Sequence, residues 1–321
     1  MINDWKDRYH ELILENALEA QDEARELKKN NLPKKLYRYR SFTKKNGIQR
    51  LYEIENGKLY LSRPEDFNDL FDVSSQLRHD SFSEYHRKDT FEETFRNKIS
   101  QEDYEMIFQS EDWYDRLMEY GANIEAPEGM KDQWKASING AIRKEFELLN
   151  EDINKMVRKL IRCACFTTKP DNGSMWANYA DDHHGICLEY DTSKIENIYQ
   201  INRLFPVYYV DKLPDMVYDM MKNRYPTFMF FEYLAIHKTK EWAYEDEWRL
   251  VYDASSFYWS KNDIPEEYWK TGKLINFICP SKIFLGARID YPSEKVIRIA
   301  AEQKDIPVVK AKKTSYGLRF E

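Results

Sequence analysis

The sequence predicts an α+β protein with a mixed or split β-sheet core and a large helical insertion. Short runs with the two-residue period of β-strands are spread over the whole chain. Predicted helices stand in clusters between these runs and do not alternate with them, which argues against a regular βαβ sheet. Neither GxGxxG nor a P-loop motif occurs, so a Rossmann or P-loop domain has no support.

Composition predicts a folded, cytoplasmic protein. Hydrophobic residues make up 42% and aromatic residues 15% of the 321 positions, which is enough for a large core. The net charge of -7 lacks the basic excess of general nucleic-acid binders. The four cysteines have no zinc-site spacing, and three lie in apolar runs, as reduced buried thiols do. No signal peptide and no apolar run of roughly 20 residues is present, so we expect no membrane association.

Two parts of unequal size are predicted. Residues 1–33 form an N-terminal helix, because apolar side chains recur at helical spacing from residue 3 to 30 and Pro33 ends the pattern. This helix either packs on the main domain or serves a dimer or another partner. Residues 34–321 form a single α+β domain with a helical insertion at about 83–160, where no strand pattern occurs.

The most informative stretch follows a helix predicted over residues 214–238. Read with a period of two, this stretch separates an aromatic side from a charged side: Trp242, Tyr244, Trp248 and Leu250 against Glu245, Glu247, Arg249 and Val251. A strand from about Tyr244 would present both glutamates and Arg249 on one open face. Two such carboxylates repel each other, which separates their pKa values. The alternative is a solvated strand whose acids pair with surface cations.

Two further segments carry candidate binding residues. Arg38 and Arg40 share one face of a predicted strand, and two arginines are costly to bury there unpaired. We expect them to meet carboxylates or a phosphate-bearing ligand. Trp176 and Tyr179 share one face of a short predicted helix, and His184 lies in the turn that follows. These three side chains are typical of a ligand rim, although a structural role for the histidine is the alternative.

These motifs, taken together and in order, resemble the bacterial family called domain of unknown function 2971. The resemblance spans about residues 35–290 and rests on residues 37–41, 59–62, 67–72, 175–190 and 242–250. The layout is similar to that of the ADP-ribosyltransferase fold. That fold has an Arg or His on its first strand, a Ser or aromatic residue on the next, and a Glu, often in an ExE motif, on a later strand. The resemblance therefore implies a sheet core of this type.

The resemblance also implies a function and a set of roles. The chain would be an NAD-dependent ADP-ribosyltransferase, with Glu247 as the catalytic glutamate and Glu245 as its ExE companion. The residues implied to bind NAD, as substrate and without a metal, are Arg38, Arg40, Tyr60, Ser62, Trp176, Tyr179 and His184. Such enzymes act as toxins or anti-phage effectors on protein or nucleic acid. An antitoxin or another inhibitory partner would be compatible with that role.

The implied chemistry is consistent with these residue types. Cleavage of the N-glycosidic bond of NAD places positive charge on the ribose, which a nearby carboxylate stabilises. A second carboxylate takes a proton from the acceptor, and an arginine pairs with the pyrophosphate.

Two alternatives from other classes stay open. The first is a metal-dependent nuclease, which would need six side chains to converge: Asp69, Asp72, His184, Glu189, Glu245 and Glu247. The second is a non-catalytic binding or regulatory module. In that module Glu245, Glu247 and Arg249 would form a structural ion network with Arg38 and Arg40.

Overall fold

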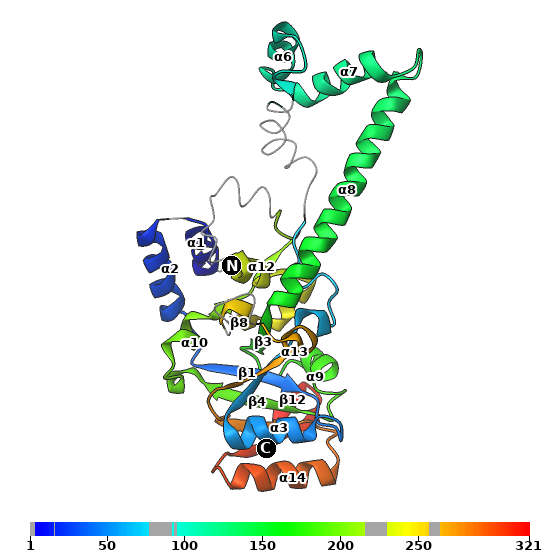
Figure 1. The fold of residues 1–321 in the computed structure, drawn as a ribbon. Coiled ribbons are helices and arrows are strands. Elements are labelled where there is room, and N and C mark those ends of the chain that lie inside the picture. The colour runs from blue at the N-terminus through cyan, green and yellow to red at the C-terminus, as the bar shows by residue number, and fades with distance from the viewer. Residues whose placement is uncertain (1–3, 16, 77–91, 93–94, 216–229, 257–263) are drawn as a thin grey trace.

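The computed structural model describes residues 4–15, 17–76, 92, 95–215, 230–256 and 264–321 (Figure 1). The described chain is a mixed α+β structure, as the sequence predicts. Its strands form one eight-stranded mixed sheet and two two-stranded ribbons. No helix among the described residues is long and apolar enough to cross a membrane.

The large sheet holds strands from both ends of the chain. Its spatial order is β12 (Gly317–Phe320), β11 (Val308–Thr314), β10 (Lys282–Leu285), β4 (Ile186–Asp191), β1 (Lys35–Arg40), β3 (Arg162–Thr167), β8 (Glu247–Tyr252) and β5 (Leu204–Pro206). The smaller ribbons are antiparallel β2 (Lys58–Leu61) with β9 (Lys273–Asn276), and parallel β6 (Tyr208–Val210) with β7 (His237–Thr239). Within the large sheet only β10 and β11, both fully described, run parallel.

The sheet opens at its centre, between β1 and β3. Both strands lie wholly within the described residues, yet they share one paired position, Tyr37 with Thr167. Strand β1 makes six pairs with β4 on its other side, and β3 makes six with β8. Beyond the shared pair, Ser62 bridges to Cys163 of β3 in both directions, through backbone bonds of 2.7 and 2.9 Å. The chain after β2 thus takes up part of the backbone pairing that β1 leaves open.

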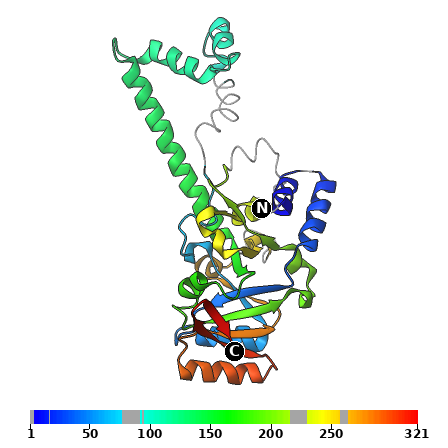
Figure 2. The same ribbon diagram turned by 180° about the vertical axis from the view of Figure 1, so that it is seen from behind.

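Helices cover the sheet and extend beyond it (Figures 1 and 2). The α-helices are α1 (Asp4–Ile13), α2 (Leu18–Asn30), α3 (Gly47–Asn56), α6 (Gln101–Phe108), α7 (Trp113–Glu125), α8 (Lys131–Leu160), α9 (Gly173–Tyr179), α10 (Ile198–Asn202), α12 (Phe230–Ala235), α13 (Glu266–Lys270) and α14 (Tyr291–Glu302). The 3₁₀ turns are η1 (Pro64–Asp66), η3 (Thr192–Lys194), η5 (Lys240–Glu245) and η6 (Ala254–Ser256).

The predicted helical insertion is helical where it is described. Helix α8 has 30 residues, about 45 Å of helix, and projects away from the sheet with α6 and α7 at its far end (Figure 1). A separate small core joins these two helices through Phe108, Trp113 and Leu117. Residues 83–91 and 93–94 of the predicted insertion lie outside the described residues.

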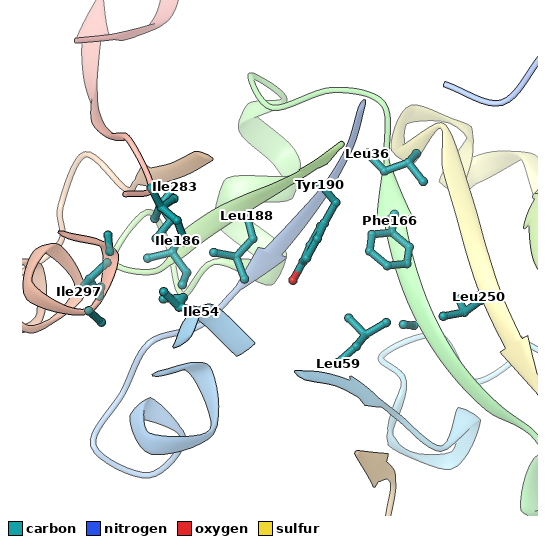
Figure 3. Close-up of a cluster of buried hydrophobic side chains, with 14 of the residues drawn as sticks. Leu36, Ile54, Leu59, Phe166, Ile186, Leu188, Tyr190, Leu250, Ile283 and Ile297 are labelled. Atoms are coloured by element: carbon teal, nitrogen blue, oxygen red, sulfur yellow. The ribbon is translucent and has the colours of Figure 1, made fainter. Parts of the chain in front are cut away.

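The main core lies on the sheet face that α3 and α14 cover (Figure 3). Side chains from both helices and from several strands meet there, among them Leu36, Ile54, Phe166, Leu188 and Ile297. Each is at most 2% exposed. Two further clusters fill the opposite face, one under α1, α2 and α12 and one around α9. The sheet is therefore covered on both faces.

The single N-terminal helix that we predicted is in fact a pair, α1 and α2. The two helices lie side by side, linked by an ion pair of 3.0 Å between Arg8 and Glu23. At the break, the Gln21 amide donates to the carbonyl of Glu15 at 2.8 Å, so a side chain satisfies a backbone acceptor that the helix leaves free. Apolar side chains of α1, including Leu12 and Ile13, pack into the core of the main domain.

Gly185 lies where the chain turns from α9 into β4, and a substitution there tests how closely the surrounding backbone is packed. A Cβ atom there would lie 2.2 Å from the Arg40 carbonyl oxygen and 2.9 Å from that of Ala180. We expect Gly185→Ala to lower the free energy of unfolding by about 1–3 kcal/mol, through overpacking. The midpoint of urea unfolding measures this loss. Gly173→Ala is the matched control, because a Cβ atom there meets nothing within 4 Å. Equal midpoints for the two variants would contradict the packing described here.

Candidate functional site

A cavity of about 270 Å³ lies at the opening between β1 and β3. Strand alternation puts Arg38 and Phe166 on the sheet face that α3 and α14 cover. The same alternation puts Tyr37, Cys165 and Glu247 on the opposite face, and these residues line the cavity too. The cavity therefore passes through the opened sheet and is accessible to side chains from both of its faces.

One wall of the cavity is a buried cluster of three carboxylates and two cations. Arg249 uses all five of its N–H donors: it bonds both oxygens of Glu247 at 2.8 and 2.9 Å, both oxygens of Asp72 at 2.6 and 2.8 Å, and the carbonyl of Ala235 at 2.7 Å. Lys238 donates to Glu245 at 2.7 Å and lies 3.5 Å from Glu247. The five charged side chains, Asp72, Lys238, Glu245, Glu247 and Arg249, are each at most 3% exposed.

The two glutamates of this acidic cluster have different electrostatic environments. Burial raises the pKa of Glu247, but Arg249 and then Lys238 outweigh it and hold that pKa at about 2. Burial and the neighbouring Glu247 raise the pKa of Glu245 above its ordinary value, against the opposing effect of Lys238. Three carboxylates against two cations leave one negative charge in excess when all are ionised. Glu245 is the group whose protonation removes that excess.

The backbone that leads into Glu245 and Glu247 differs from the continuous strand that we predicted. Residues 240–245 form the 3₁₀ turn η5, and β8 begins only at Glu247. Asp246 between them adopts a left-handed conformation, with φ 43° and ψ 56°, and accepts a hydrogen bond from the Thr168 hydroxyl. The predicted open charged face is also wrong, because every residue of β8 is buried. Glu247 and Arg249 do share a face, and they pair with each other there.

Two tyrosines complete the carboxylate arrangement. The Tyr179 hydroxyl donates to Glu245 Oε1 at 2.5 Å. The Tyr209 hydroxyl accepts a hydrogen bond of 2.9 Å from the backbone N–H of Glu247. The Glu245 carboxylate is thus held by a hydroxyl in addition to a cation, whereas the second hydroxyl holds the backbone at Glu247.

The other wall of the cavity is basic. Arg38 and Arg40 of β1 line it, and they share one face of the strand as the sequence predicts. Arg40 and Arg50 both donate to Glu53 Oε1, at 3.1 and 3.0 Å, so two arginines share one carboxylate oxygen. Arg38 donates to the carbonyl of Tyr60 at 2.7 Å, whereas its Nη1 has no hydrogen-bond partner among the described residues. Burial, followed by the neighbouring Arg40, lowers the pKa of Arg38 to about 10.

The structure brings some predicted site residues together and places others elsewhere. Among the predicted residues, those lining the cavity are Arg38, Arg40, Ser62, Tyr179, Glu245 and Glu247. Trp176 is fully buried against Tyr39 and donates to the carbonyl of Pro170, so its ring is a core element. The Tyr60 hydroxyl accepts a hydrogen bond of 2.9 Å from the backbone N–H of Gly272. His184 is exposed in its turn, with Nδ1 2.8 Å from the carbonyl oxygen of Asp181.

Sequence reasoning missed two residues of the acidic cluster. Lys238 was predicted to close a helix but lies in the short strand β7, paired in register with Tyr209. Most of that predicted helix, residues 216–229, lies outside the described residues. Asp72 was predicted only as a possible ligand of the metal-dependent nuclease. The signal that could have found both is charge balance, since Glu245 and Glu247 need buried cations and Arg249 needs a second carboxylate.

Neither alternative network forms as predicted. Among the described residues no group of three or more His, Cys, Asp or Glu side chains is placed to hold a metal ion. The carboxylates Asp72, Glu245 and Glu247 meet ammonium and guanidinium groups instead, and Glu189 pairs with Lys35 at 2.6 Å. The structural ion network exists, but its cations are Lys238 and Arg249.

A comparison with known proteins supports the family resemblance over part of the chain. The model of a family described as "Protein of unknown function (DUF2971)" matches residues 175–250. This stretch contains Tyr179, Lys238, Glu245 and Glu247 of the acidic wall. No curated protein and no solved structure matches the chain.

Substitution of the two glutamates should have unequal effects on stability. We expect Glu247→Gln to lower the free energy of unfolding by about 3–5 kcal/mol, because it leaves the buried Arg249 short of a charged partner. Glu245→Gln should cost less, because Lys238 keeps Asp72 at 3.4 Å and Glu247 at 3.5 Å as charged partners and burial disfavours the charged form of Glu245. Urea unfolding of the two variants measures the difference. Equal losses would contradict the charge distribution described above.

Acid should remove the contribution of Glu247 over a defined range. Its pKa is about 2 in the fold and has an ordinary value of 4.5, so the ionised form stabilises the folded state. That contribution is fully present above about pH 4.5 and is lost as the pH falls towards 2. Glu245 contributes with the opposite sign, because its pKa is raised. Melting temperatures between pH 6 and about 2 should fall more steeply for the wild type than for Glu247→Gln, and parallel curves would refute this.

Proposed function

We propose that the chain is an NAD-dependent ADP-ribosyltransferase that binds its donor in the cavity between β1 and β3. The observation that carries the proposal is the opposition of two buried charged walls across one cavity. The acidic wall has one negative charge in excess when all its groups are ionised, and the basic wall presents Arg38 and Arg40, of which Arg40 shares Glu53 with Arg50. NAD carries a cationic nicotinamide ring and an anionic pyrophosphate a short distance apart, so it complements both walls.

The size of the cavity limits how much of the donor it encloses. Pockets that enclose a drug-sized ligand measure about 300–1,000 Å³, and this cavity of about 270 Å³ is at or below that range. It suits the nicotinamide and its ribose, with the first phosphate at Arg38. The adenosine half of NAD would then extend out of the cavity. The Arg38 Nη1, which is buried and has no hydrogen-bond partner in the described part of the chain, supports this direction, because a guanidinium N–H pairs well with a phosphate oxygen.

The two carboxylates take different parts in the proposed reaction. The bond between C1′ of the ribose and the nicotinamide nitrogen breaks, and nicotinamide leaves with the electron pair. Glu247 stays ionised beside Arg249, so its charge stabilises the positive ribose. An acceptor oxygen or nitrogen forms the new bond to C1′, and its proton passes to Glu245, whose raised pKa suits a general base.

The biological role follows the resemblance named above. We propose an effector of the toxin or anti-phage kind, with a protein or a nucleic acid as acceptor. An inhibitory partner such as an antitoxin would prevent such a protein from consuming cellular NAD. The net charge of -7 favours a protein acceptor over a nucleic acid.

NAD turnover by the purified protein tests this proposal. Nicotinamide release and transfer of labelled ADP-ribose to lysate acceptors are measured for the wild type and three variants. Glu245→Gln should lower kcat by about 10²–10⁴-fold, as loss of a general base does. Arg38→Lys keeps the charge but loses the fork geometry, so it should raise KM for NAD by roughly tenfold.

Glu266→Gln is the control for that experiment, because the Glu266 carboxylate is 81% exposed and pairs only with the neighbouring Lys270 among the described ion pairs. It should leave both kinetic constants unchanged. A wild-type protein that neither binds nor cleaves NAD would overturn the proposed function. Free nicotinamide without transfer would identify a glycohydrolase instead of a transferase.

A further inference from the structure

Helix α1 contacts the segments that carry the acidic wall. Trp5 stacks on Trp248, with ring centroids 6.1 Å apart and planes 26° apart. Lys6 Nζ lies 3.5 Å from Asp246 Oδ1. One turn on, His10 Nε2 lies 2.7 Å from His237 Nε2.

The β6–β7 ribbon gives α1 a further anchor. The Tyr208 hydroxyl donates to Asp7 Oδ1 at 2.8 Å, and its ring stacks on His10 with centroids 4.2 Å apart. His237 Nδ1 is 2.6 Å from the carbonyl of Tyr233, so it donates there and its Nε2 accepts from His10. Burial lowers the pKa of both histidines, to about 4 for His10 and about 3 for His237, so both are neutral and this hydrogen bond is available at neutral pH.

Each partner of α1 is the sequence neighbour of a residue in the acidic wall. Tyr208 precedes Tyr209, which binds the Glu247 backbone, and His237 precedes Lys238, which binds Glu245. Tyr208 pairs with His237 across the ribbon, and Tyr209 pairs with Lys238. Because successive strand residues point to opposite faces, α1 holds one face of the ribbon and the carboxylates meet the other.

At the start of β8, the residues that α1 contacts are again sequence neighbours of the two glutamates. Asp246 stands between the two glutamates, and Trp248 follows Glu247 on the opposite face of the strand. Asp246 adopts a left-handed backbone conformation, which aspartate tolerates better than most residues, and contacts of its side chain stabilise it there. Those contacts are the Thr168 hydroxyl and the ammonium group of Lys6.

We propose that α1 is a positioning clamp for the acidic wall, and that Lys6 and His10 are its positioning residues. Neither residue lines the cavity. Lys6 holds the turn that directs Glu245 and Glu247 to Lys238, and His10 holds the strand that supplies Lys238. Displacement of α1 therefore loosens both carboxylates without touching the cavity. The effect on turnover rests on the proposed function; the effect on the geometry does not.

Backbone hydrogen exchange followed by mass spectrometry tests the clamp on the full chain. Lys6→Met removes the ion pair and His10→Phe removes the hydrogen bond while keeping a ring beside Tyr208. Lys6→Met loses a long ion pair of 3.5 Å and His10→Phe a hydrogen bond of 2.7 Å, so exchange in residues 237–248 should become roughly twofold faster in the first variant and about five- to tenfold faster in the second. Lys6→Arg should restore the wild-type rate, since it keeps the cation.

Arg8→Met is the matched control on the same helix. Arg8 is exposed and pairs with Glu11 and Glu23, away from the acidic wall. It should leave exchange in residues 237–248 unchanged. Unchanged exchange in both clamp variants would overturn the proposal, and so would an equal increase over the whole chain or in Arg8→Met.

NAD turnover provides a second readout of the clamp. A positioning role predicts a lower kcat for Lys6→Met and His10→Phe with KM for NAD unchanged, because Arg38 is untouched. An altered KM with unchanged kcat would count against the clamp. If the wild type does not cleave NAD, the proposed function fails while the exchange measurement still decides whether α1 positions the wall.

Discussion

Tyr37 and Thr167 form the single backbone pair between β1 and β3, and their position decides where the sheet opens. On one side of this pair the strands diverge, and Ser62 bonds to Cys163 across the gap. The divergence gives Arg38 a place at the cavity although its side chain points to the face opposite Glu247. A fully paired sheet would separate these two side chains by the backbone itself. The cavity and the opposition of its walls therefore depend on one missing stretch of backbone pairing.

Both walls bury charge that the fold does not fully neutralise. Isolated buried charges are costly, so buried ionic groups persist where partners and hydrogen bonds hold them. Arg249 is fully bonded and is the structural centre of the acidic wall, whereas Glu245 keeps a raised pKa. On the basic wall, Nη1 of Arg38 has no hydrogen-bond partner among the described residues, so this wall also carries a charge that is not fully paired. Perturbed pKa values and unpaired polar groups of this kind cluster at functional sites.

The regular strand patterns could be predicted from the sequence, and the irregular connections could not. Two-residue alternation correctly placed Arg38 and Arg40 on one face of β1, and Glu247 and Arg249 on one face of β8. It failed just before β8, because a 3₁₀ turn and the left-handed Asp246 leave no distinct periodicity. A strand as short as β7 carries too few residues to show a period, which is why Lys238 was missed.

The aromatic candidates show a second limit of sequence reasoning. Trp176 and Tyr179 lie on one short helix, and their spacing predicts a common face. The structure buries the Trp176 ring against Tyr39, while the Tyr179 hydroxyl reaches Glu245. Which of the two meets the cavity depends on the packing of α9 against β1, a tertiary contact that no local pattern contains.

If one ligand spans the two charged walls, a crystal structure of the protein with NAD will show it. We expect a donor phosphate oxygen within hydrogen-bond distance of Arg38 Nη1 and the nicotinamide ribose beside Glu245 and Glu247. The Arg249 pairs with Glu247 and Asp72 should be unchanged in that complex. NAD bound outside the opening between β1 and β3, or a cavity that remains empty at saturating NAD, would show that the two walls do not bind NAD together.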